Sequence, residues 1–136
     1  MRPKPQEVEA EVIRQIKEYG ISDSSLVLHE RTDIPDLMNA MDILIFPSQS
    51  EGLGNVAVEA QAAGLHCLMS SGVPQAADIS NYAEHMSLSC TPKEWADKAI
   101  SMCEATAAIE YKDYDAWDMK NVVSKLLSYY EEALKE

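Results

Sequence analysis

Two short apolar runs separated by an alanine-rich stretch constrain the fold of this chain more than any other feature. The first run, DILIFPS (residues 42–48), contains a closing proline, and the second, LHCLMSS (residues 65–71), follows Gly64. Continuous apolar runs of this length are typical of strands buried on both faces of a parallel sheet. The stretch between them, about residues 55–63, has a helical composition and stops at Gly64, a residue suited to a helix C-terminus. This strand–helix–strand unit predicts parallel strands with a helix packed across them.

The same alternation continues on both sides of this unit. Further strands are expected at residues 24–30 (SSLVLHE) and 85–90 (HMSLSC), which makes about four strands. Helices are expected over residues 6–19 ending at Gly20, from near Pro35 after Thr32 or Asp33, from Thr91 and Pro92 with a capping box to Glu94, and over residues 115–134. The pattern predicts an α/β fold, a three-layer doubly wound parallel sheet with flanking helices.

Composition indicates one ordinary globular domain. The chain has 136 residues, 46% of them hydrophobic and 25% charged, which is enough for one core and too little for two. No apolar run approaches the roughly 20 residues that cross a bilayer, and the first residues lack the apolar segment of a signal peptide. Three cysteines without paired spacing are typical of reduced thiols, so we expect a cytoplasmic protein.

Charge excludes some partners and limits how an anion could be bound. The net charge is −12, which argues against nucleic acid and anionic membranes as primary partners. No Lys or Arg occurs between Thr32 and Pro92, whereas seven Asp and Glu residues do. A phosphate bound in this middle region would therefore depend on backbone amides and a helix dipole, or on basic groups from elsewhere.

The segment SEGLGNVAVEAQ (residues 50–61) joins the first buried run to the helix and places two glutamates eight positions apart. Gly52 and Gly54 permit a close backbone approach, and the first turn of the helix presents free N–H groups suited to a diphosphate. Glu59 lies inside the apolar helix, where an unpaired carboxylate is costly to bury. Either Glu59 faces solvent, with Glu51 a solvated loop charge, or a ligand supplies its partner, such as the two hydroxyls of a ribose.

The run DIPDLMNAMDILIFPSQSEGLGNVAVEAQAAGL resembles the C-terminal half of a family 4 glycosyltransferase, a retaining enzyme with the GT-B fold. The following segment, SGVPQAADISNYAEHMSLSCTPKEWADKAI, is similar to members that act in exopolysaccharide and capsule synthesis. The resemblance implies an incomplete Rossmann-like C-terminal domain of this fold over residues 1–136. It implies the transfer of a hexose from a nucleotide sugar, with no cofactor and no metal ion, and a UDP- or GDP-sugar as the usual donor.

The family also implies roles for matching positions in this sequence. Glu59 would hold the ribose of the nucleotide sugar, and Glu51 would contact the donor sugar near the reacting carbon as the catalytic residue. The remaining donor-binding positions lie at the end of the strand and at the start of the helix: Pro47, Ser48, Gly52, Leu53, Gly54, Asn55 and Val56. Retaining transfer on this fold depends on stabilising the leaving diphosphate, a task suited to preorganised amides.

With 136 residues, the chain is shorter than an enzyme of this family. From the resemblance, we expect the N-terminal domain, which binds a lipid-linked or saccharide acceptor, and the first strands of the donor domain to be absent from these residues. We therefore expect a fragment without transferase activity alone, whose parent acts in the cytoplasm or at the inner face of the membrane. The incomplete sheet edge favours self-association. The alternatives are a nucleotide-sugar epimerase of the same fold and a non-catalytic partner subunit or degenerate remnant.

Overall fold

The computed structural model describes residues 5–112 and 114–134. The chain divides into two compact units, Met1–Asp33 and Ile34–Glu136. The first unit holds helix α1 (Pro5–Glu18) and a short 3-10 turn, η1 (Ser22–Ser24). Gly20, two residues after the end of α1, has a φ of +67°, as predicted for the residue that ends this helix.

The predicted strand at residues 24–30 is wrong. Residues 25–29 take an irregular conformation after η1, and the apolar side chain of Leu26 is 81% exposed. A strand needs a neighbour to satisfy its backbone N–H and C=O groups. The described part of the first unit contains no strand with which the β-forming residues of this run could pair.

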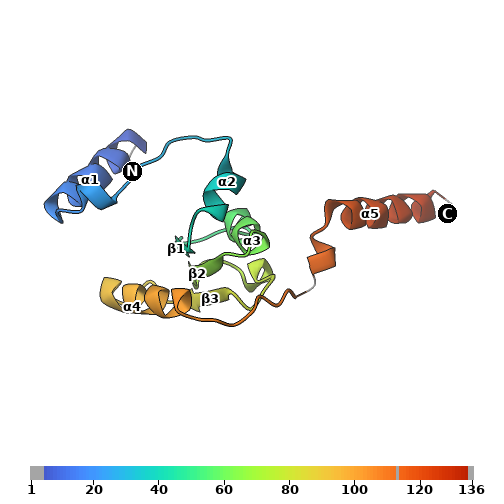
Figure 1. Ribbon diagram of the computed structural model, residues 1–136. Helices are drawn as coiled ribbons and strands as arrows, with labels where there is room; N and C mark the ends of the chain where they lie inside the picture. The colour runs from blue at the N-terminus through green and yellow to red at the C-terminus, as the bar shows by residue number, and fades with distance from the viewer. Residues whose placement is uncertain (1–4, 113, 135–136) are drawn as a thin grey trace. The chain divides into compact units, whose positions relative to one another are not determined.

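The second unit is built on a parallel sheet of three strands in the order β1-β2-β3 (Figure 1). These strands are β1 (Ile43–Phe46), β2 (His66–Ser70) and β3 (Ala83–Met86). Parallel pairing places Ile43 opposite His66, and Met69 opposite His85. The α/β fold class and the parallel sheet are confirmed, with three strands in place of about four.

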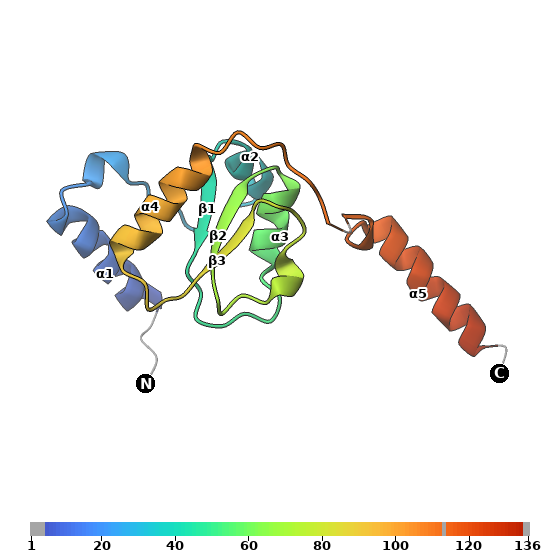
Figure 2. The ribbon, with the colours of Figure 1, turned by 90° about the horizontal axis from the view of Figure 1, so that it is seen from below.

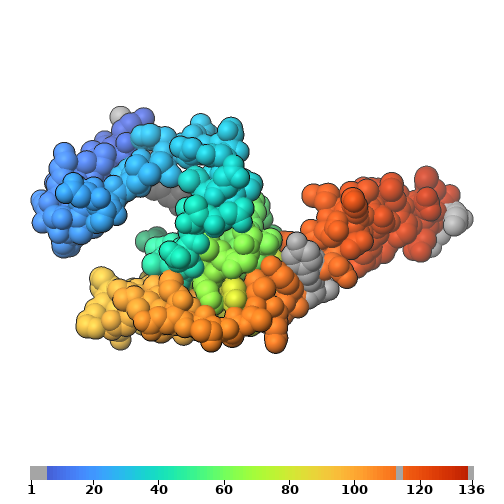
Figure 3. Space-filling model, viewed as in Figure 1, coloured from blue at the N-terminus to red at the C-terminus, as the bar shows by residue number. Residues whose placement is uncertain are grey.

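Helices cover both faces of this sheet. Figure 2 shows α2 (Ile34–Asn39) and α3 (Asn55–Ala62) on one side and α4 (Pro92–Cys103) on the other. In the space-filling view, the cyan and green atoms of the segments that hold α2 and α3 lie above the yellow-orange atoms of α4 (Figure 3). Side chains of β2 alternate between the two faces of the sheet. Cys67 and Met69 belong to the core under α3, and Leu68 belongs to the core under α4.

Strand β1 is less buried than its apolar sequence predicts. Leu44 and Phe46 pack against the core under α3, but Ile45 is 46% exposed. The reason is the strand order, because β1 lies at the edge of the sheet and has only β2 beside it. The prediction of a strand buried on both faces holds for β2 and is wrong for Ile45 of β1.

The elements after β2 follow the predictions with shifted bounds. A short 3-10 turn, η2 (Gln75–Ala77), follows Pro74. Strand β3 begins before residue 85 and is followed by a turn in which the Cys90 N–H donates to the Ser87 carbonyl at 3.0 Å. Helix α4 begins with the predicted capping box between Thr91 and Glu94.

The last predicted helix, residues 115–134, is a 3-10 turn, η3 (Tyr114–Ala116), followed by α5 (Met119–Ala133). None of the helices in the described ranges is long and apolar enough to cross a membrane.

Candidate functional site

The loop after β1, residues 47–54, carries most of the predicted site residues. Within it, the hydroxyl of Ser48 donates a hydrogen bond of 2.6 Å to Oε1 of Glu51. The backbone N–H of Glu51 donates to the carbonyl of Gly72 at 3.1 Å. Two hydrogen bonds therefore hold Glu51. Its backbone N–H is bonded to the segment just after β2, and its carboxylate is bonded to Ser48.

The ends of β1 and β2 are joined by close backbone contact. A Cβ atom on Gly72 would lie 2.4 Å from the carbonyl oxygen of Gln49, so only glycine fits there without a shift of the backbone. Next to it, the buried hydroxyl of Ser70 donates to the Ser48 carbonyl and accepts from Gly72 N–H at 3.2 Å. The sequence predictions include neither Ser70 nor Gly72; the Ser-Ser-Gly that follows the buried run was the available signal.

Helix α3 starts at the end of this loop without a side-chain cap. Gly54 is the N-cap, with a φ of +88° that favours glycine. The first bond of the helix runs from Ala57 N–H to the Gly54 carbonyl at 2.9 Å. The N–H groups of Asn55 and Val56 precede this bond, so they lie at the positive end of the helix dipole, where an anion is stabilised.

The structure brings the predicted residues together along one loop and one helix start. Glu59 lies one turn into α3, on the same helix as Asn55. Four of the predicted residues are exposed: Pro47, Gly52, Asn55 and Glu59. Gly54 is buried, and the other predicted residues are partly buried.

Glu59 faces solvent, which explains how an apolar helix can carry it. It lines a pocket of about 200 Å³ together with Ile79 and Trp117. Across residues 5–112 and 114–134, no side chain forms a hydrogen bond or ion pair with its carboxylate. Its charge carries no burial cost, and its oxygens are open to a ligand; ribose binding stays a prediction.

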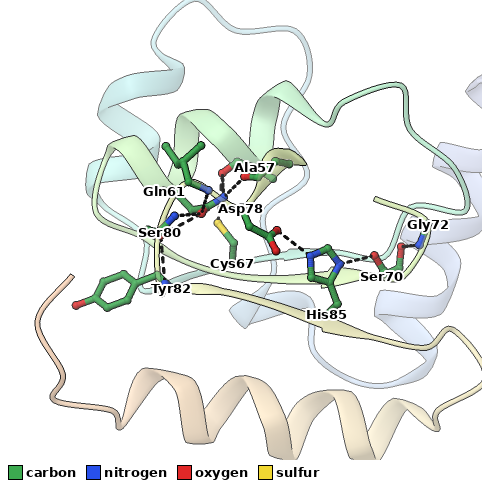
Figure 4. A network of polar contacts seen from close by, with 11 residues as sticks. Ala57, Gln61, Cys67, Ser70, Gly72, Asp78, Ser80, Tyr82 and His85 are labelled. Atoms are coloured by element: carbon green, nitrogen blue, oxygen red, sulfur yellow. Dashed lines mark hydrogen bonds and ion pairs between the residues drawn. The ribbon is translucent and has the colours of Figure 1, made fainter. Parts of the chain in front are cut away.

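The buried polar residue of α3 is Gln61, which the sequence predictions did not single out. Its side-chain amide donates to the Ala57 carbonyl at 2.9 Å and to the Ala77 carbonyl at 2.8 Å. Its oxygen accepts from the backbone N–H groups of Ile79 and Ser80 at 3.0 and 3.1 Å, and from the Ser80 hydroxyl at 3.0 Å. Figure 4 shows this network, which fastens α3 to the segment after η2.

Other reactive side chains do not gather at the loop. Burial raises the pKa of the Cys67 thiol to about 12, so this cysteine is an unreactive core residue. In the described ranges, no group of three or more His, Cys, Asp and Glu side chains is arranged to hold a metal ion. The lysines of α4 are paired with carboxylates, Lys93 with Asp97 and Lys98 with Glu84.

Comparison with known proteins identifies the family. The profile of the family described as "Glycosyl transferases group 1" matches residues 6–113. "Putative glycosyltransferase EpsF" of Bacillus subtilis (strain 168) is 32% identical over 88 residues, which are 64% of this chain and 23% of the relative. "Capsular polysaccharide biosynthesis glycosyltransferase CapH" of Staphylococcus aureus is 24% identical over 116 residues, 83% of this chain and 32% of the relative.

A third relative, "UDP-Gal:alpha-D-GlcNAc-diphosphoundecaprenol alpha-1,3-galactosyltransferase" of Escherichia coli, is 41% identical over 46 residues, 34% of this chain and 12% of the relative. The chain thus spans less than a third of the length of these relatives. No solved structure matches it significantly. Because the family profile extends over most of the sequence, the chain belongs to the glycosyl transferases group 1, the family 4 glycosyltransferases that its sequence resembles.

Proposed function

We propose that this chain is the donor-binding part of a retaining glycosyltransferase that transfers a hexose during bacterial exopolysaccharide or capsule synthesis. One observation carries the proposal. The loop after β1 places Glu51, whose carboxylate accepts a hydrogen bond from Ser48, just before the N-terminus of α3, which no side chain caps. In parallel α/β sheets, ligands bind beyond the carboxyl ends of the strands. This loop leaves the carboxyl end of β1 and contacts the carboxyl end of β2.

Each part of the site then has a task. The backbone N–H groups from Gly52 to Val56 bind the diphosphate of the donor, because the start of α3 offers unpaired donors and the positive end of a dipole. The carboxylate of Glu59 accepts hydrogen bonds from the ribose hydroxyls. Pro47 and Ser48 form the corner at which the chain leaves β1, and Ser48 orients Glu51.

Glu51 acts near the reacting carbon of the donor sugar. Its carboxylate is aligned before a donor arrives, because the Ser48 hydroxyl already bonds it at 2.6 Å. Preorganised groups of this kind stabilise developing charge without being rearranged during the reaction. The amides at the start of α3 stabilise the leaving diphosphate in the same way.

The names of the relatives support a donor class and an acceptor class. The Escherichia coli relative is named for UDP-Gal and for a diphosphoundecaprenol acceptor, and the Staphylococcus aureus relative for capsular polysaccharide synthesis. We infer a UDP- or GDP-sugar as donor and a lipid-linked or saccharide acceptor. We infer that acceptor binding lies in a part of the enzyme outside residues 1–136, so these residues alone transfer no sugar. They bind a donor weakly, because no Lys or Arg between Thr32 and Pro92 is present to neutralise its diphosphate.

An amide NMR titration with UDP-glucose and GDP-mannose tests the proposal. Shifts clustered on residues 51–59, and weakened at least several-fold by Glu59→Gln, are the expected result. Glu104→Gln is the matched control, because Glu104 is an exposed glutamate at the end of α4 and leaves the loop unchanged. Absence of shifts at millimolar ligand, or equal loss in both variants, would overturn the proposed site.

A further inference from the structure

His85, in β3, lies between two acceptors at the carboxyl end of the sheet. Its Nε2 is 2.8 Å from Oδ1 of Asp78, and its Nδ1 is 3.2 Å from the backbone carbonyl oxygen of Ser70 (Figure 4). The His85 and Asp78 side chains are only 20% and 18% exposed. His85 therefore bridges the segment after η2 and the last residue of β2.

The chemistry of the two acceptors decides the proton count of the ring. A backbone carbonyl accepts hydrogen bonds and cannot donate them, and the same is true of a carboxylate. A neutral imidazole has one N–H and can satisfy only one of these partners. The imidazolium has two N–H groups, so it is the form that makes both contacts at once.

The Ser70 contact connects His85 to the loop after β1. The same Ser70 donates its hydroxyl to the Ser48 carbonyl and accepts from Gly72 N–H. Ser48 in turn donates to Glu51, whose own N–H bonds the Gly72 carbonyl. A continuous set of hydrogen bonds thus runs from His85 to the carboxylate of Glu51.

We propose that His85 is a positioning residue whose doubly protonated form holds the carboxyl end of β2, and through it the loop that carries Glu51. The role in donor binding rests on the proposed function; the effect on the loop does not. When the ring loses its proton, the charge-assisted bond to Asp78 is kept and the bond to the Ser70 carbonyl is lost. The end of β2 and the loop after β1 then become more mobile.

The charged groups around His85 agree with this assignment. Asp78, from the segment after η2, is its ion-pair partner. On the same face of the sheet, β2 contributes Cys67, whose pKa is raised to about 12 by burial and which is therefore uncharged at neutral pH. The carboxylate of the loop between β1 and α3 is that of Glu51, which accepts a hydrogen bond from Ser48. Glu84, adjacent on β3, is paired with Lys98 of α4.

The first test follows the loop without ligand. In amide NMR spectra recorded across about pH 5 to 8, where histidines titrate, the signals of Gly72 and Glu51 should follow the titration of the His85 ring. The ring should carry protons on both nitrogens at the acidic end. In His85→Gln this dependence should vanish, whereas His29→Gln should keep it, because His29 is 74% exposed and lies in the first unit.

The second test measures affinity for UDP-glucose at pH 6 and at pH 8. This ligand is chosen because its diphosphate, esterified at both ends, does not titrate in this range. Affinity should fall about three- to tenfold at the higher pH, as expected for the loss of one hydrogen bond, and should become independent of pH in His85→Gln. The inference would be contradicted if the pH dependence of the affinity were lost in the control His29→Gln and kept in His85→Gln.

The outcomes separate this inference from the proposed function. If the loop signals follow His85 but UDP-glucose does not bind at either pH, the inference stands and the proposed function fails. If the ligand binds with an affinity independent of pH, and Gly72 and Glu51 do not follow His85, the inference fails alone. If His85→Gln does not fold, Asp78→Asn replaces it, because this change removes the charged partner of the ring. A pH dependence of the Gly72 and Glu51 signals that Asp78→Asn leaves unchanged would then contradict the inference.

Discussion

The hydroxyl of Ser48 donates a hydrogen bond of 2.6 Å to the carboxylate of Glu51, three residues further along the same loop. This contact fixes a charged side chain by a neighbour in sequence, before any ligand is present. We predict that Ser48→Ala lowers affinity for a UDP-sugar about three- to tenfold, because the freed carboxylate must be ordered on binding. Calorimetry or an NMR titration measures this, with Ser50→Ala as control; equal losses in both variants would contradict it.

The glycines of the loop region should differ sharply in their tolerance of a methyl group. Gly72→Ala places a Cβ atom 2.4 Å from the Gln49 carbonyl oxygen, which forces the two backbones apart. We expect it to lower the free energy of unfolding by about 1–3 kcal/mol, as overpacking usually does. Gly52→Ala is the control, since its Cβ would meet nothing within 4 Å. Urea unfolding of the two variants gives the comparison, and similar stabilities would refute the close contact.

Gln61 should be the most sensitive polar residue of α3. Gln61→Leu keeps a similar volume but leaves the Ser80 N–H without its partner. The Ala77 carbonyl and the Ile79 N–H each lose one hydrogen bond to Gln61 and keep the bond between them at 3.1 Å. A buried group without a partner costs about 1–3 kcal/mol, so we expect the free energy of unfolding to fall by about 1–3 kcal/mol. Gln75→Leu, at an exposed glutamine of η2, should be nearly neutral. A loss below about 1 kcal/mol for Gln61→Leu would contradict the network.

The raised pKa of Cys67 predicts how stability changes in alkali. Its thiol has a pKa of about 12 in the folded chain because of burial, against 9.0 for the free group. Above about pH 9 the unfolded chain therefore releases a proton that the folded chain keeps, so stability falls as pH rises, by about 1 kcal/mol per pH unit. Unfolding measured from pH 8 to 10 should show a shallower fall in Cys67→Ala. In the same range, an alkylating agent should modify the exposed Cys103 first.

Self-association through the edge strand, expected from the sequence, remains to be measured. Ile45 is 46% exposed on β1 and borders an apolar groove of about 430 Å³ with Leu88 and Trp95. Ile45→Lys should lower the average mass of the chain in sedimentation experiments at high concentration. Ile100→Lys, at a 57% exposed isoleucine of α4, should leave it unchanged. If the unmodified chain is monomeric at every concentration, the prediction of self-association is wrong.

Local sequence signals predicted much of the fold and part of the site. The capping box at Thr91 and the turn at Gly20 depend on a few neighbouring residues, so they could be predicted from the sequence. The loop from Pro47 to Val56 and its approach to the start of α3 could also be predicted, because a strand, glycines and a helix follow one another along the chain.

Features that depend on distant partners could not be predicted in this way. Residues 25–29 have strand-forming side chains, but a strand also requires a neighbour, which no local pattern reveals. The exposure of Ile45 follows from the position of β1 at the sheet edge. The importance of Gln61 and Gly72 comes from backbone groups of other segments, with which they are brought together only in the folded chain.

The strands of the sheet stand in the same order in space as along the chain, each joined to the next by a single crossover. Each pairing therefore closes only a short stretch of polypeptide, and the loss of chain entropy on closure is small. Folding rates rise as contacts become more local, so the second unit can gain its parallel sheet stepwise, one strand added to the last. On a nascent chain, β1 and β2 leave the ribosome before β3 does, so they are free to pair first.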